Sequence, residues 1–72
     1  MMNVKIRTDF IKLDAMLKYV NAVESGGMAK EVILEGEVKV NGEVCTMRGK
    51  KLYPGDQVAF DGNTYFIENA SN

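Results

Sequence analysis

Residues 39–51 gather four cations around a single carboxylate, Glu43. The four are Lys39, Arg48, Lys50 and Lys51. Ammonium and guanidinium groups at this density attract phosphates and displace their counterions. The remaining residues carry five cations against nine carboxylates, so the net charge of −1 hides an uneven distribution. The segment therefore predicts a phosphate-binding face, and its simplest alternative is a solvated strand and loop.

Other chemistry is poorly supported by the composition. Histidine is absent, which removes the commonest general base and the commonest metal ligand, so we expect no enzyme, no metal site and no cofactor. A chain of 72 residues also leaves little volume for a deep small-molecule site. The single cysteine, Cys45, cannot form an internal disulfide and is read as a small apolar residue, which favours a cytoplasmic location. No apolar run is long enough to span a membrane.

Hydrophobic periodicity predicts the elements that must position the cations. Residues 4–10 alternate as a strand with one wet face, and residues 13–20 then change to a helical period. A second helix is predicted over 28–36, capped by Ser25 or a following glycine and ended at Gly36. The apolar faces of the two helices are Leu13, Met16, Leu17 and Val20, and Met28, Ala29, Val32 and Ile33.

From residue 37 the period returns to two, which predicts a run of short strands. Val38, Val40 and Val44 are expected to point inward and Lys39 outward. Tight turns are predicted at Asn41-Gly42, at Pro54-Gly55 and at residues 61–63. The remaining strands are 57–60 and 64–68. The aromatic residues Tyr19, Phe60, Tyr65 and Phe66 are read as core or packing residues. The prediction is an α+β fold in one domain, 1–72, with a helical hairpin packed on a small curled, mostly antiparallel sheet.

The order of these residues resembles the S4-type RNA-binding domain. The stretches "KLDAMLKYV", "SGGMAKEVILEGEVKVNGEV" and "RGKKLYPGDQV" carry the resemblance over about residues 12–60, and "SGGMAK" is most similar to small stand-alone bacterial members of the YaaA/YbcJ type. The matching positions are Lys12-Leu13-Asp14, Ala29-Lys30, the run 36–42 and Gly55-Asp56. Where many members have an arginine after the serine, this chain has Gly26.

The resemblance implies binding of structured RNA, often ribosomal, by phosphate contacts and shape, in ribosome assembly or quality control. The implied RNA-binding residues are Lys12, Gly26, Gly27, Lys30, Lys39, Asn41, Arg48, Lys50 and Lys51. We expect these cations to converge beside the start of the second helix, whose free N–H groups would partly replace the missing arginine. Glu31 and Glu35 are expected to face away from the RNA, and Asn41 to serve first as a turn former. Tyr53 is read as a half-buried residue ahead of its turn, with stacking on an exposed base as the alternative.

Two other functions fit parts of the sequence. A protein-interaction adaptor could dock on ribosomal or ribosome-associated proteins through the acidic side of the domain. A β-grasp sulfur carrier resembles the run from 38 to 60, but its chemistry needs a C-terminal Gly-Gly, and this sequence ends in "IENASN". We therefore expect RNA as the partner, and neither a membrane nor a small-molecule substrate.

Overall fold

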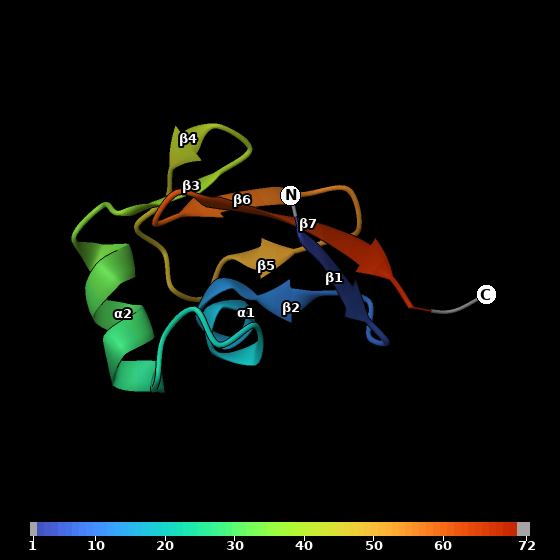
Figure 1. The fold of residues 1–72 in the computed structure, drawn as a ribbon, viewed down its shortest axis with the longest axis horizontal. Helices are drawn as coiled ribbons and strands as arrows, with labels where there is room; N and C mark the ends of the chain where they lie inside the picture. The colour runs from blue at the N-terminus through green and yellow to red at the C-terminus, as the bar shows by residue number, and fades with distance from the viewer. Residues whose placement is uncertain (1, 71–72) are drawn as a thin grey trace.

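A computed structural model describes residues 2–70 and shows two helices and seven strands in this part of the chain (Figure 1). The helices are α1 (Leu13–Tyr19) and α2 (Gly26–Leu34). The strands are β1 (Met2–Ile6), β2 (Ile11–Lys12), β3 (Val38–Val40), β4 (Glu43–Val44), β5 (Lys51–Leu52), β6 (Gln57–Phe60) and β7 (Asn63–Asn69).

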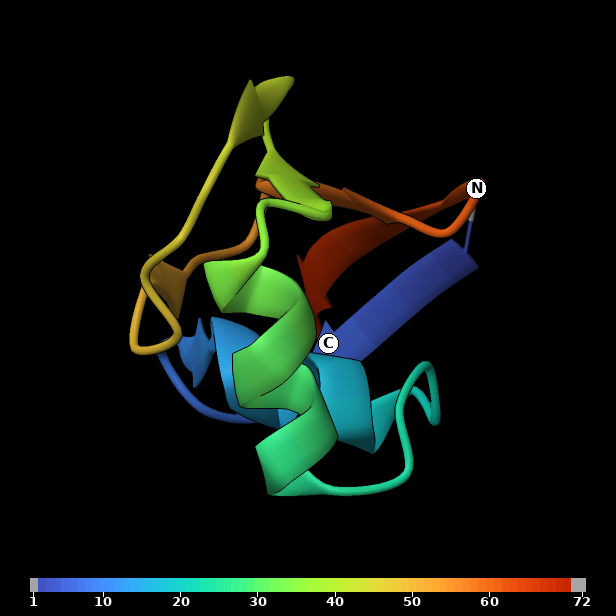
Figure 2. The same cartoon turned by 90° about the vertical axis from the view of Figure 1, so that its left-hand side faces the viewer.

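The strands form two sheets. The larger has the order β1-β7-β6-β3-β4, in which β1 runs parallel to β7 and the other neighbours are antiparallel. The smaller pairs β2 with β5 antiparallel. Figures 1 and 2 show both helices on one side of the larger sheet, with α1 next to β2. The predicted α+β architecture with a mostly antiparallel sheet is confirmed.

One hydrophobic core joins the helices to the sheet. Its fully buried members come from both kinds of element, as the two periodicities predict: Leu13, Met16, Leu17, Ala29, Ile33, Val38, Leu52, Val58 and Ile67. Burying each large aliphatic side chain contributes about 1.5–3 kcal/mol relative to leaving it in water. The core therefore holds α1 rigidly against the sheet, and α1 positions the site described below.

The ends of α2 follow the predicted signals. The Ser25 hydroxyl accepts a hydrogen bond from the N–H of Met28 at 3.1 Å, so Ser25 caps the helix, which begins at Gly26 and not at residue 28. Gly36 has a φ of 80° and ends it. The N–H groups of Gly36 and Glu37 donate to the carbonyls of Ile33 and Val32, a pairing typical of a left-handed helix terminus.

Several local predictions were wrong. β1 ends at Ile6, because the chain bends at once and the exposed Thr8 hydroxyl donates to the carbonyl of Phe10. Val44 is 55% exposed, since it lies opposite Lys39 and so shares its outward face. Met28 is also exposed, on the first turn of α2.

The aromatic residues divide between core and surface. Tyr65 is buried in the core and the half-buried Phe60 packs against it, as predicted. Phe66 is half-buried on the opposite face of β7, between the buried Tyr65 and Ile67. Tyr19 is 60% exposed, so its assignment to the core was wrong. It is the last residue of α1, where the helix leaves the core, and its hydroxyl donates to the carbonyl of Lys5 at 3.1 Å.

Candidate nucleic-acid interface

The loop that carries most of the predicted cations is fixed to the start of α1 by backbone hydrogen bonds. The N–H of Leu13 donates to the carbonyl of Lys50 at 2.8 Å, and the N–H of Asp14 donates to the carbonyl of Arg48 at 3.1 Å. These N–H groups belong to the first turn of α1 and have no partner within the helix. Lys12, which precedes them, offers no side-chain cap. The loop carbonyls therefore take the place of a capping residue.

This docking brings the backbone of the loop next to Lys12. In the β2–β5 pair, Lys12 lies directly opposite Lys51, and both side chains are exposed. Like charges in directly opposed positions destabilise a strand pair. We call these residues the α1 cluster: Lys12, Arg48, Lys50 and Lys51. Within residues 2–70, none of the four forms an ion pair with a carboxylate.

Asp14, the carboxylate that follows Lys12 most closely in the sequence, bonds to its own helix. One carboxylate oxygen of Asp14 accepts the N–H of Ala15 at 2.7 Å, in the first turn of α1. A carboxylate is favourable there because the helix dipole places partial positive charge at that end. The backbone pairing thus brings four cationic residues to the start of α1, and cations on neighbouring backbone positions together attract a polyanion.

Two aromatic rings border the α1 cluster. The ammonium nitrogen of Lys51 lies 4.8 Å from the centroid of the Phe10 ring. The Phe10 and Tyr53 ring centroids are 5.9 Å apart with an interplanar angle of 50°. Tyr53 is 48% exposed, so part of its ring faces solvent beside the cations. Stacking of a base on Tyr53 stays a prediction.

Asn41 forms the predicted tight turn and also joins this turn to the one at residues 53–56. Asn41 and Gly42 have φ values of 52° and 87°, as the tight turn requires. The Asn41 amide donates to the Asp56 carboxylate at 3.1 Å and accepts the N–H of Gln57 at 2.9 Å. Asp56 also accepts the N–H of Tyr53 at 2.8 Å. The Asn-Gly and Pro-Gly-Asp turns are therefore locked to one another, and a contact of Asn41 with RNA stays a prediction.

The start of α2 holds three more of the predicted RNA-binding residues, Gly26, Gly27 and Lys30. Within the described residues, no hydrogen bond or ring contact joins Gly26, Gly27 or Lys30 to the cluster. A side chain at Gly26 would meet no atom within 4 Å, so packing does not demand a glycine there. Lys30 is exposed on the second turn. The loop backbone is fixed to the first helix, and the expected convergence of the cations beside the start of α2 stays a prediction.

Lys39 lies on the outer face of β3, as predicted. Its neighbours Val38 and Val40 are buried on the opposite face. Val40, Asn41 and Glu43 line a surface hollow of about 330 Å³ together with Lys50. Lys39 is not among the residues that line it. Its contact with RNA stays a prediction.

Carboxylates gather at the other end of α2. Glu31, Glu35 and Glu37 are all exposed. A side-chain hydrogen bond with Glu37, helped by partial desolvation and by the Glu37 charge, raises the pKa of Glu35 above its ordinary value of 4.5. The negative end of the helix dipole lies there too, so this end is strongly anionic. It is a poor surface for a phosphate backbone.

Comparison with known proteins decides the family. The model of the S4 domain matches residues 4–68. The chain belongs to the S4 domain family. This S4 protein is 46% identical over 59 residues to the "Probable ribosome maturation protein RlbA" of Bacillus subtilis, covering 82% of this chain and 83% of that one. It is 41% identical over 54 residues to the "Putative RNA-binding protein YbcJ" of Escherichia coli, covering 75% and 77%. The resemblance to small stand-alone S4 proteins is confirmed.

A solved structure supports the fold independently. The S4 protein superimposes on Heat Shock Protein 15 of Vibrio cholerae with a TM-score of 0.73, covering 86% of this chain and 66% of that one, at 23% identity. At this identity the likeness shows the fold alone. Neither helix within residues 2–70 has the length and apolar character needed to cross a membrane.

Proposed function

We propose that this S4 domain, taken as a single unit over residues 1–72, is a non-enzymatic RNA-binding module for structured RNA, foremost ribosomal RNA. It would act in the cytoplasm, in ribosome assembly or quality control, beside ribosomal or ribosome-associated proteins. The observation that carries the proposal is the α1 cluster, whose four exposed cations are held together by backbone pairing. The family, and the printed names of the relatives from Bacillus subtilis and Escherichia coli, support the same function.

The mechanism is electrostatic and geometric. The cluster cations would displace counterions from neighbouring phosphates, and their fixed spacing would select an RNA surface with phosphates at matching positions. Because the loop is held by its backbone, only its side chains need to be ordered when the RNA arrives. Further contacts are proposed at Gly26, Gly27, Lys30, Lys39 and Asn41.

Salt dependence tests this mechanism. With about four to six phosphate contacts, affinity for a ribosomal RNA fragment should fall roughly 10²–10³-fold between about 50 and 200 mM salt. Filter binding at several salt concentrations measures the slope of log affinity against log salt. Undetectable binding at the lower salt, or an affinity that does not change with salt, would show that phosphate contacts are not the basis of recognition.

A further inference from the structure

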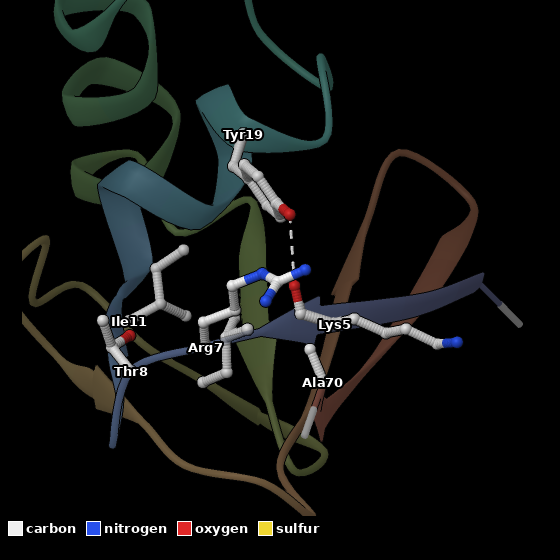
Figure 3. A pocket seen from close by; sticks show the side chains of 7 residues that line it. Lys5, Arg7, Thr8, Ile11, Tyr19 and Ala70 are labelled. Carbon is white, nitrogen blue, oxygen red and sulfur yellow. Dashed lines mark hydrogen bonds between the residues drawn. The ribbon is translucent and has the colours of Figure 1, made fainter. Parts of the chain in front are cut away.

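A second basic surface lies at the opposite end of α1. It is an open hollow of about 550 Å³ between β1, the segment that follows it, the end of α1 and the residue after β7 (Figure 3). Its lining residues include two cations and no carboxylate: Lys5, Ile6, Arg7, Thr8, Ile11, Tyr19 and Ala70. None of the residues proposed above to bind RNA belongs to it.

Tyr19 presents a fixed aromatic ring in this hollow. The ring is anchored at one end by α1 and at the other by the hydrogen bond from its hydroxyl to the carbonyl of Lys5, yet the residue is 60% exposed (Figure 3). An anchored ring loses little further freedom when a flat partner covers it. Exposed aromatic rings of this kind are the platforms on which proteins stack unpaired bases.

Arg7 supplies the charge beside this ring. Figure 3 shows its guanidinium directed toward the hydroxyl end of Tyr19, while the side chain of Lys5 points away. Arg7 forms no ion pair within residues 2–70. Lys5 lies opposite Glu68 in the β1–β7 register. Arg7 is therefore the cation available to a phosphate next to a base stacked on Tyr19.

The hollow and the α1 cluster are connected along one segment of chain. Thr8 and Ile11 line the hollow, and Lys12, which follows Ile11, belongs to the cluster. Phe10, between them, lies under the ammonium group of Lys51. A nucleic-acid strand that leaves the cluster along this segment passes the exposed Asp9 and reaches Tyr19 without crossing the acidic end of α2.

We propose that the hollow holds an unpaired nucleotide of an RNA whose structured part lies on the α1 cluster, with its base on Tyr19 and its phosphate at Arg7. This proposal rests on the proposed function. It adds a second subsite and a preferred RNA form, a stem that continues into a single strand.

The test compares an RNA hairpin with the same hairpin carrying a short single-stranded extension at its 5′ or 3′ end, at one fixed salt concentration. The wild-type protein should bind one of the extended forms about tenfold more tightly than the blunt form. Tyr19→Ala should remove this preference and leave blunt binding unchanged. Tyr19→Phe keeps the ring and should keep most of the preference, and Arg7→Gln should reduce it.

The outcomes separate the two proposals. Failure to bind any of the hairpins overturns the proposed function and this inference with it. Equal binding of blunt and extended forms by the wild type, or an equal loss for both forms in Tyr19→Ala, overturns only the inference. Crosslinking 4-thiouridine in the extension to the wild-type protein gives a readout without mutation. It should attach near Tyr19 and residues 5–8, and attachment confined to other segments contradicts the proposal.

Discussion

Replacing Arg48, Lys50 and Lys51 together by alanine is expected to lower the affinity for structured RNA about a hundredfold or more at low salt. Each side chain is exposed and free of ion pairs within residues 2–70, so its loss should remove the proposed phosphate contact and leave the core intact. The slope of log affinity against log salt should also become shallower by about 2–3. Filter binding across a salt series, with circular dichroism to confirm folding, measures both effects.

Two single substitutions provide the matched control. Lys51→Ala and Lys18→Ala each remove one charge from an exposed lysine, but only Lys51 belongs to the α1 cluster. Lys51→Ala should weaken binding about tenfold, and Lys18→Ala about twofold or less. Equal effects of the two would mean that total charge, and not its placement, controls affinity.

The second large effect concerns stability. Asp56→Ala should lower the free energy of unfolding by about 2–3 kcal/mol, because the carboxylate accepts hydrogen bonds from the Asn41 amide and the Tyr53 N–H. In a domain of this size each 1 kcal/mol lowers Tm by about 4–8 °C, so a fall of about 10 °C or more is expected. Urea and thermal unfolding provide the two measurements.

Asp9→Ala is the control for this change. Asp9 is an exposed carboxylate for which the described part of the chain provides no hydrogen-bond partner, so its loss should leave stability nearly unchanged. If Asp56→Ala unfolds at the same urea concentration as Asp9→Ala, the two turns are not locked as described.

Local sequence signals predicted the helices and turns well. Leu13, Met16 and Leu17 repeat at a helical period and are fully buried, and the Ser25 cap and the Gly36 terminus are where the sequence placed them. Such signals are short-range, since each depends on residues within one or two turns of chain. Local signals of this kind can therefore be recognised in a single sequence.

The arrangement of the site was harder to predict from the sequence, because hydrogen bonds between backbone groups create it. The hydrogen bonds from the start of α1 to the carbonyls of Arg48 and Lys50 depend on no particular side chain. No residue type in the sequence therefore predicts them. The β2–β5 pair has only two residues in each strand, too few to show a period. The parallel β1–β7 pair joins opposite ends of the chain, beyond the reach of local patterns.

The hydrogen bonds that join the two turns could not be predicted either, because their residues lie far apart in the sequence. Asn41 and Asp56 were both recognised as parts of turns, but the bond between them spans 15 residues. Tyr19 was misplaced for a different reason. It follows the core residues Met16 and Leu17 closely, yet the short helix ends there and turns the ring toward β1.

The most direct test of the RNA-binding surface is a titration of isotope-labelled protein with a ribosomal RNA hairpin, followed by backbone amide NMR. If the α1 cluster is the surface, the largest shifts should come from amides of residues 12–14 and 48–52. Glu35 and Glu37, at the acidic end of α2, should hardly change. Shifts concentrated at that acidic end, with residues 48–52 unaffected, would contradict the assignment of the α1 cluster as the RNA-binding surface.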